Sequence, residues 1–170
     1  RGLAGAVGTD DGVDLAGIMV DAGPVNSKLL VRIGSRDGDG DARRSGDPVA
    51  LQDVFVRIGG PQVGKATVTM EVNSDDVLLD DIWLWRADHG NGVGWTINTA
   101  DTGVVINGDD VTAYGLFVEH YQKYNAIWNG NAGRVVLFQN ELPYDPPSQA
   151  AWMSAPGVYG WAALKVGDHV

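Results

Sequence analysis

Short apolar runs recur along the whole chain, and almost all of them are bounded by Gly, Asn or Asp. Most runs are 3–8 residues long and rich in β-branched or aromatic residues, which is typical of β-strands. No stretch of about 12 residues without glycine has the i, i+3, i+4, i+7 apolar spacing of an amphipathic helix. The pattern predicts an all-β chain with strands at residues 15–20, 29–33, 51–58, 66–72, 77–79, 82–85, 103–107, 111–114, 116–118 and 135–138.

Several of these runs resemble one another. They share the order polar, polar, aliphatic, aromatic, aliphatic, clearly in Gln52–Val56, Asp80–Leu84 and Tyr114–Val118 and more weakly in Ala16–Val20. A repeat of roughly 20 to 36 residues with variable insertions is typical of a solenoid of β-coils. Each coil then stacks its strands about 4.8 Å from those of the next, and an exposed end coil needs a cap. The aliphatic positions expected to stack are Ile18, Val54, Ile82 and Leu116, followed by the run at Phe138. The alternative is an ordinary β-sandwich in which the likeness is accidental.

The length and composition fit one β-helix domain over residues 1–170. The 24 glycines favour many turns between short strands. A net charge of −10 argues against nucleic-acid binding, because phosphate contacts need basic patches. No apolar run approaches the roughly 18 residues that span a membrane, so no membrane partner is expected. The absence of cysteine excludes disulfides and thiolate metal sites, and we expect no cofactor.

One polar segment, residues 35–48, is expected to be a loop between coils. Asp37, Asp39 and Asp41 have the spacing that opens an EF-hand calcium loop, but Ala42 stands where glycine is required and Pro48 replaces the closing glutamate. A solvated loop is therefore the preferred interpretation. The chain begins at Arg1 without Met and ends within a strand-like pattern with no clear cap. We interpret it as a mature form or as part of a longer chain.

Two glutamates 22 residues apart carry the main chemical hypothesis. Glu119 and Glu141 each follow an apolar strand-like run, so on successive coils they would face each other at one strand spacing, about 4.8 Å between Cα atoms. Two such carboxylates cannot both ionise freely, and one would keep its proton to a higher pH and act as a general acid. The alternative is that both are solvated, or that they pair with Lys123 or Arg134.

Polar and aromatic residues accompany these glutamates. Asp88 and His89 leave a strand into a Gly-rich loop, where the carboxylate can orient the imidazole or simply stabilise the loop. The spacing of the three histidines does not suggest zinc. Trp83 and Trp85 point to one face of a regular strand, either toward sugar or into packing. Further rings follow near the glutamates, at Tyr121, Tyr124, Trp128, Tyr144 and Trp152.

Three motifs occur in a characteristic order: Trp83–His89, ending in Ala-Asp-His; Val118–His120 with Tyr124 soon after; and Gln139–Tyr144 followed by Pro146. In this order the segment from about Asp81 to Trp152 resembles the β-helical β-1,3-glucanases of glycoside hydrolase family 55, the laminarinase type. The resemblance implies a right-handed parallel β-helix of the pectate-lyase type and an inverting β-1,3-glucan hydrolase without a cofactor. It covers less than half of the chain strongly.

The resemblance also implies roles for individual residues. Glu141 falls on the family's proposed general acid, and Glu119 falls in the same site. Substrate contacts are expected from Gln139, His120, Tyr124, Tyr144, Trp128, Asp88 and His89. Family enzymes are far longer and place the site between two β-helices. We therefore expect a segment of a secreted polysaccharide hydrolase whose parent chain supplies a second β-helix, and the activity of the isolated chain stays open.

The spacing of the carboxylates qualifies the mechanism. Carboxyl groups about 5 Å apart suit retention, whereas inversion needs about 6.5–9.5 Å to admit water. If inversion holds, Glu119 modulates Glu141 or binds sugar, and other groups hold the water. Two rival functions remain: a non-catalytic β-helix that binds glycan or builds an assembly, and a polysaccharide lyase. The negative charge argues against the lyase, which acts on acidic uronates.

Overall fold

The computed structural model describes residues 6–7, 15–35 and 48–167. The three aspartates of the calcium-like sequence and most of the polar segment 35–48 lie outside these ranges. The strands are β1 Ala6–Val7, β2 Leu15–Asp21, β3 Ser27–Ile33, β4 Val49–Ile58, β5 Ala66–Val72, β6 Val77–Arg86, β7 Ala100–Ile106, β8 Thr112–Glu119, β9 Ala126–Trp128, β10 Arg134–Glu141, β11 Met153–Ala155, β12 Val158–Tyr159 and β13 Leu164–Val166. A short 3-10 helix, η1, spans Gln149–Ala151.

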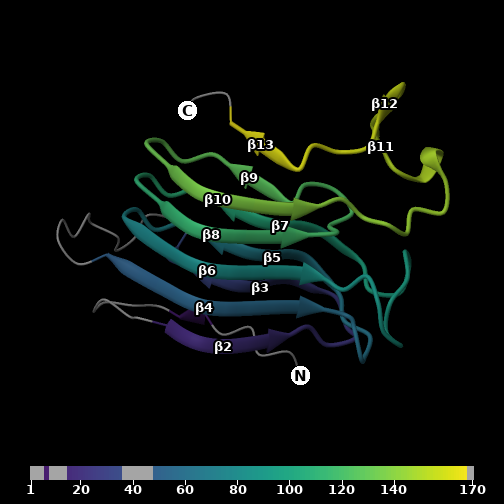
Figure 1. The fold of residues 1–170 in the computed structure, drawn as a ribbon, viewed down its shortest axis with the longest axis horizontal. Coiled ribbons are helices and arrows are strands. Elements are labelled where there is room, and N and C mark those ends of the chain that lie inside the picture. The colour runs from purple at the N-terminus through teal and green to yellow at the C-terminus, as the bar shows by residue number, and fades with distance from the viewer. Residues whose placement is uncertain (1–5, 8–14, 36–47, 168–170) are drawn as a thin grey trace.

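The strands form two parallel sheets that lie one behind the other (Figure 1). One sheet has the order β1-β3-β5-β7-β9-β13 and the other β10-β8-β6-β4-β2. Consecutive strands from β2 to β10 therefore alternate between the sheets. Each strand from β2 to β8 pairs with the strand two places further along the chain, and β9 pairs with β13. Among the described strands, β11 and β12 form an antiparallel hairpin. The prediction of an all-β chain with stacked parallel strands is confirmed, and the parallel pairing argues against the sandwich alternative, which would need antiparallel hairpins.

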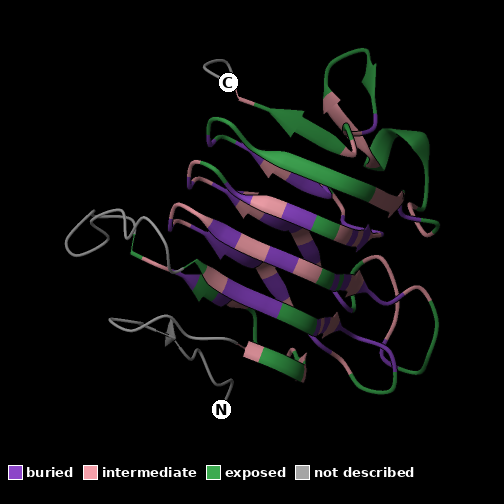
Figure 2. Ribbon diagram, turned by 60° about the vertical axis from the view of Figure 1, so that its left-hand side comes forward, coloured by how far each residue is buried: buried purple, intermediate pink, exposed green. Residues whose placement is uncertain are grey.

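The repeated aliphatic positions are in register with one another. Ile18 pairs with Val54, Val54 with Ile82, Ile82 with Leu116, and Leu116 with Phe138. Val54 and Ile82 are fully buried and Leu116 nearly so. Figure 2 shows such buried positions along the strands that lie between the two ends of the sheets. Burying a side chain of this size contributes about 1.5–3 kcal/mol, so this column is a main source of stability.

One position in the repeat has a positive φ in every strand of the β2–β10 sheet. It is the residue just before each stacked position: Gly17 (64°), Asp53 (51°), Asp81 (53°), Gly115 (68°) and Leu137 (65°). Glycine and aspartate tolerate this left-handed conformation better than other residues. That tolerance explains the polar or glycine residue at the second place of the repeat, and Leu137 is the strained exception.

A second repeat lies in the turns between the sheets, and its sequence signal was overlooked. It begins with an asparagine at residues 73–76, 107–110 and 129–132. Asn107 Nδ2 donates to Asn73 Oδ1 at 2.7 Å, and Asn129 Nδ2 donates to Asn107 Oδ1 at 2.8 Å. A Cβ on Gly130 would lie 1.7 Å from the carbonyl oxygen of Gly108. The turns therefore stack too closely for a side chain at that position.

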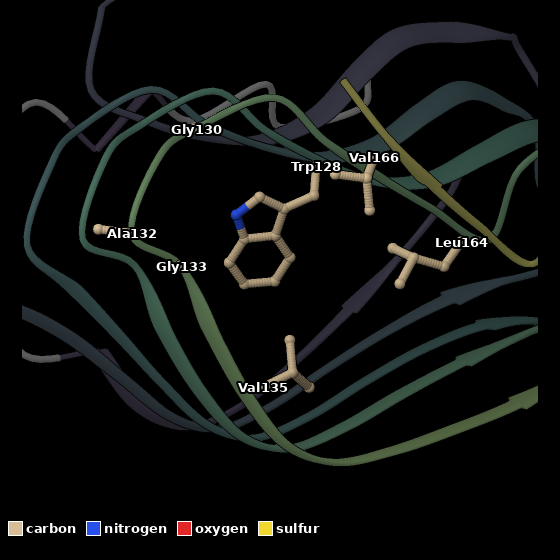
Figure 3. Close-up of a pocket in the computed structure, with 7 residues that line it drawn as sticks. All are labelled: Trp128, Gly130, Ala132, Gly133, Val135, Leu164 and Val166. Carbon is tan, nitrogen blue, oxygen red and sulfur yellow. The ribbon is translucent and has the colours of Figure 1, made fainter. Parts of the chain in front are cut away.

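The sheets end in an apolar hollow at β10 and β13. It has a volume of about 290 Å³. In Figure 3 the Trp128 side chain lies between the ribbons of the two sheets, with Val135 from one and Leu164 and Val166 from the other. All three aliphatic side chains are exposed, and Figure 2 shows that β10 is largely exposed.

Candidate functional site

The two glutamates face each other on adjacent strands, as the repeat predicted. Glu119 ends β8, Glu141 ends β10, and the two pair in register. On the other side of Glu119 its register partner is Trp85 of β6. Their side chains therefore share one face of the sheet at one strand spacing, about 4.8 Å between adjacent Cα positions.

Three side chains surround the Glu141 carboxylate. Gln139 Nε2 donates to Glu141 Oε1 at 3.3 Å, and the Tyr144 hydroxyl donates to Glu141 Oε2. His120 Nε2 lies 3.7 Å from the same Oε2. The hydrogen bond to Glu141, with smaller contributions from desolvation and from the negative charge of Glu141, raises the pKa of Tyr144. Glu141 remains more than a third exposed, at 38%, so its carboxyl can reach a ligand.

His120 is turned beneath Glu141 by its backbone. It follows β8 directly with a φ of 66°, and its amide donates to the carbonyl of Glu141 at 2.8 Å. Its Nδ1 lies 3.0 Å from the carbonyl oxygen of Leu142, which can only accept, so Nδ1 carries a hydrogen. The ring lies 4.5 Å from that of Tyr144 and is buried. The buried His120 ring thus forms one wall of the site, and its Nε2 atom faces the Glu141 carboxylate.

Asp88 and His89 stand beside this wall. Asp88 Oδ1 lies 2.8 Å from His89 Nδ1 and 3.9 Å from His120 Nε2. Partial burial alone would raise the pKa of Asp88, but the hydrogen bond from His89 and the nearby imidazoles outweigh it and lower the pKa. The His89 ring is exposed and lies 5.1 Å from Trp85. Asp88 and His89 therefore continue the row of polar side chains from His120 toward Trp85, away from Glu141.

An aromatic strip runs along the same face beside Glu119. Trp83 and Trp85 stack at 5.3 Å with an angle of 24°, and Phe55 meets Trp83 edge-on at 5.9 Å. Trp83 Nε1 donates to Glu119 Oε2 at 2.9 Å. The prediction that both tryptophans share one face is confirmed. Trp83 is 37% exposed, so its ring lies at the surface and not in the core.

Two residues expected at the site lie elsewhere. Trp128 belongs to β9 in the other sheet and lines the apolar hollow at the end of the two sheets (Figure 3). Tyr124 packs against Trp161 at 5.0 Å, and Lys165 lies over its ring at 5.6 Å. Both residues follow β8, where the chain crosses to the other sheet. Lys123, the suggested partner of the glutamates, instead pairs with Asp101 at 2.7 Å.

Sequence reasoning missed Arg86 and Asp145. The Arg86 side chain is 1% exposed and makes a two-point ion pair with Asp145, 59 residues away. Arg86 stands inside the Trp83–His89 motif, and a charged residue at the end of an apolar strand was a usable signal for a buried partner. The described residues contain no cluster of three or more His, Cys, Asp or Glu side chains arranged to hold a metal. They also include no helix long and apolar enough to cross a membrane.

Comparison with known proteins connects this geometry to a family. Residues 3–141 match the model of the LAM55 pectate lyase-like domain. Over 164 residues, 96% of this chain, the sequence is 54% identical to an exo-β-1,3-glucanase of Streptomyces sp. (strain SirexAA-E / ActE). The match covers only 27% of that relative.

Solved structures give the same relationship. The structure of sacteLam55A from Streptomyces sp. SirexAA-E aligns with 94% of this chain at a TM-score of 0.87 and 54% identity, covering 29% of its own length. A variant of sacteLam55A in complex with glucose aligns at a TM-score of 0.86 and 53% identity. This chain thus spans between a quarter and a third of the relatives it matches. By its family model, its identity over nearly its whole length and its shared fold, the chain belongs to the LAM55 pectate-lyase-like family, the glycoside hydrolase family 55 type.

Proposed function

We propose that this chain is the part of a β-1,3-glucan hydrolase that carries its general acid, Glu141. The observation that supports this most directly is the environment of the Glu141 carboxyl. It is partly exposed beside an aromatic strip and surrounded by Gln139, Tyr144 and His120. Aromatic faces bind the apolar faces of sugars while polar side chains bind the hydroxyls. The 54% identity to an exo-β-1,3-glucanase supports the choice of glycan.

The reaction proceeds by inversion. Glu141 donates its proton to the glycosidic oxygen as the bond from that oxygen to the anomeric carbon breaks. A water molecule bonds to the anomeric carbon from the opposite face and loses a proton to a base. That base belongs to the rest of the parent protein, because Glu119 is one strand away from Glu141 on the same face and is held by Trp83. Glu119 instead orients sugar and adds negative charge beside the acid.

The remaining polar groups bind substrate. Gln139 orients the Glu141 carboxyl, and Asp88 and His89 stand where sugar hydroxyls on the Trp85 side would be reached. A polymeric glycan cannot enter a cell intact, so the enzyme acts outside the cell. We further propose that the strands which alternate between the two sheets form the coils of a right-handed parallel β-helix. A second β-helix of the parent chain would then complete the cleft.

Replacement of Glu141 by Gln in the full-length protein tests the assignment. We expect release of glucose from laminarin-type substrates to fall about 100-fold or more, because a glutamine cannot donate the proton. The same variant should lose much less of its activity on an aryl β-glucoside with a good leaving group, because that group can depart without being protonated. Undiminished laminarin hydrolysis by Glu141→Gln would refute the proposal.

Glu119→Gln is the matched control, since it changes the same chemical group one strand away. It should weaken hydrolysis of laminarin and of the aryl glucoside to a similar extent, because its role does not depend on the leaving group. Binding of insoluble glucan without any release of sugar by the wild-type protein would instead favour a glycan-binding module.

A further inference from the structure

Arg86 is a buried cation that does not contact the Glu141 carboxylate. It ends β6, and its side chain is 1% exposed. A buried charge is costly unless it is paired and fully hydrogen-bonded. Asp145 supplies the opposite charge in a two-point contact, with Nη1 2.9 Å from Oδ1 and Nη2 2.7 Å from Oδ2.

The remaining hydrogens of the guanidinium are all accounted for. Arg86 Nε donates to the carbonyl of Asn98 at 2.8 Å, Nη1 to that of His120 at 3.2 Å, and Nη2 to that of Gly94 at 3.4 Å. A guanidinium has five N–H donors, and each of the five has an acceptor here. One side chain therefore ties together the loop after β6, the turn after β8 and the segment after β10.

Two of these three points connect to Glu141, one through the side chain of Tyr144 and the other through that of His120. Asp145 follows Tyr144, whose hydroxyl donates to Glu141. His120, whose carbonyl accepts from Arg86, places its Nε2 3.7 Å from Glu141. We propose that Arg86 and Asp145 form a positioning pair that holds Tyr144 and His120 against Glu141 without touching the substrate. This inference rests on the proposed function of Glu141.

The shape of the pair fits positioning better than generic stabilisation. A buried ion pair often adds little net stability compared with apolar residues of the same volume. A planar guanidinium fork can satisfy a carboxylate and several carbonyls at fixed angles, whereas the point charge of lysine cannot. Displacement of a catalytic group by about 1 Å can cost about 100-fold in rate, so this rigidity matters at an acid.

The test uses Asp145→Asn and Arg86→Lys in the full-length protein, with Asp101→Asn as the control. Asp101 of β7, in the other sheet, forms an ion pair of the same 2.7 Å length with Lys123, but both of these side chains are exposed. Two kinds of measurement are made on each folded variant. The first is steady-state kinetics on laminarin, which gives kcat and KM, and the second is the ultraviolet titration of Tyr144, identified by comparison with Tyr144→Phe. The titration reports whether the hydroxyl still contacts the Glu141 carboxylate.

We expect Asp145→Asn and Arg86→Lys to lower kcat about 10- to 100-fold with little change in KM. The titration of Tyr144 should move toward that of an ordinary tyrosine in both variants, and Asp101→Asn should change neither measurement. If Asp145→Asn does not fold, the double variant Arg86→Met with Asp145→Leu, which leaves no unpaired charge, is measured instead.

Unchanged kcat and an unchanged Tyr144 titration in the folded variants would overturn the positioning role. The two proposals can fail separately. Full activity of Glu141→Gln would remove the proposed function, while the Tyr144 titration would still decide whether the pair positions this residue.

Discussion

Glu119 and Glu141 are paired in register on adjacent parallel strands, yet their carboxylates have different partners. Glu119 accepts from the indole of Trp83, and Glu141 accepts from Gln139 and Tyr144. Two chemically identical side chains one strand apart are thus placed in different environments. Separate roles for two carboxyl groups commonly arise in this way.

Removal of the Glu141 charge should change the titration of Tyr144. The Glu141 carboxylate raises the pKa of Tyr144, because it accepts the phenolic hydrogen and repels the phenolate. In Glu141→Gln the pKa of Tyr144 should fall toward the ordinary tyrosine value of about 10. An ultraviolet titration measures this shift, and Glu119→Gln should give a smaller one. An identical titration in Glu141→Gln would show that the hydroxyl does not contact this carboxyl.

Asp81→Asn should stabilise the fold at neutral pH. Desolvation is the largest cause that raises the pKa of Asp81, followed by the hydrogen bond and charge of Asp53 on the next strand. A carboxyl with a raised folded pKa favours folding below its unfolded pKa of about 3.9, and that contribution is lost as pH rises through the folded pKa. The variant should therefore melt higher than wild type at pH 7, and the difference should shrink in acid.

Asp76→Asn provides the control for the Asp81 variant. Asp76 also has a positive φ, 55°, so the change from aspartate to asparagine is matched in backbone conformation. We expect Asp76→Asn to raise the melting temperature at pH 7 by less than Asp81→Asn does. An equal gain in both variants would point to the overall negative charge and not to the Asp53–Asp81 contact.

Leu137→Asn should relieve backbone strain. Leu137 has a φ of 65° and is 64% exposed, so its conformation is unfavourable and its side chain contributes little burial. The left-handed conformation costs an ordinary residue about 1–2 kcal/mol, and asparagine tolerates it better. Denaturant unfolding should show a gain in free energy of up to about 1 kcal/mol. Val136→Asn, one residue earlier in the strand, should give no gain; a loss in Leu137→Asn would contradict the strain.

Gly130→Ala should strongly destabilise the turn repeat. Its Cβ would lie 1.7 Å from the carbonyl oxygen of Gly108, and a backbone atom cannot move aside easily. We expect a loss of about 3 kcal/mol or more in the free energy of unfolding. Gly23→Ala is the control, because a Cβ there has no neighbour within 4 Å. Similar stabilities for the two variants would mean that the turns are not stacked this closely.

The residue pattern predicted the sheet that carries the site. The sequence pattern predicts that the repeated aliphatic positions Ile18, Val54, Ile82 and Leu116 stack, and their register is as expected. The facing of Glu119 and Glu141 followed from the same repeat. These features are predictable because side-chain alternation and stacking depend only on local pattern and on a constant strand spacing.

The residues that surround the two glutamates were harder to predict from the sequence. Tyr124 and Trp128 are close to Glu119 in sequence, but the chain crosses to the other sheet after β8 and carries them away. The overlooked pair of Arg86 and Asp145 joins residues 59 apart. No local pattern specifies that distance, because it depends on how three separate loops fold back over the strand ends.

The sequence by itself determined strands β2 to β8 and β10, their repeat and the face that presents Glu119, Glu141 and the two tryptophans, but it did not indicate β1, β9 or β11 to β13. Only the tertiary structure decided which groups meet at Glu141. His120 turns under the carboxylate because its φ is 66°, and Tyr144 reaches the carboxylate on a segment fastened to Arg86. Hydrophobic periodicity fixes a strand and its buried face, whereas contacts between strand ends depend on loop paths and on a few backbone angles that the periodicity does not encode.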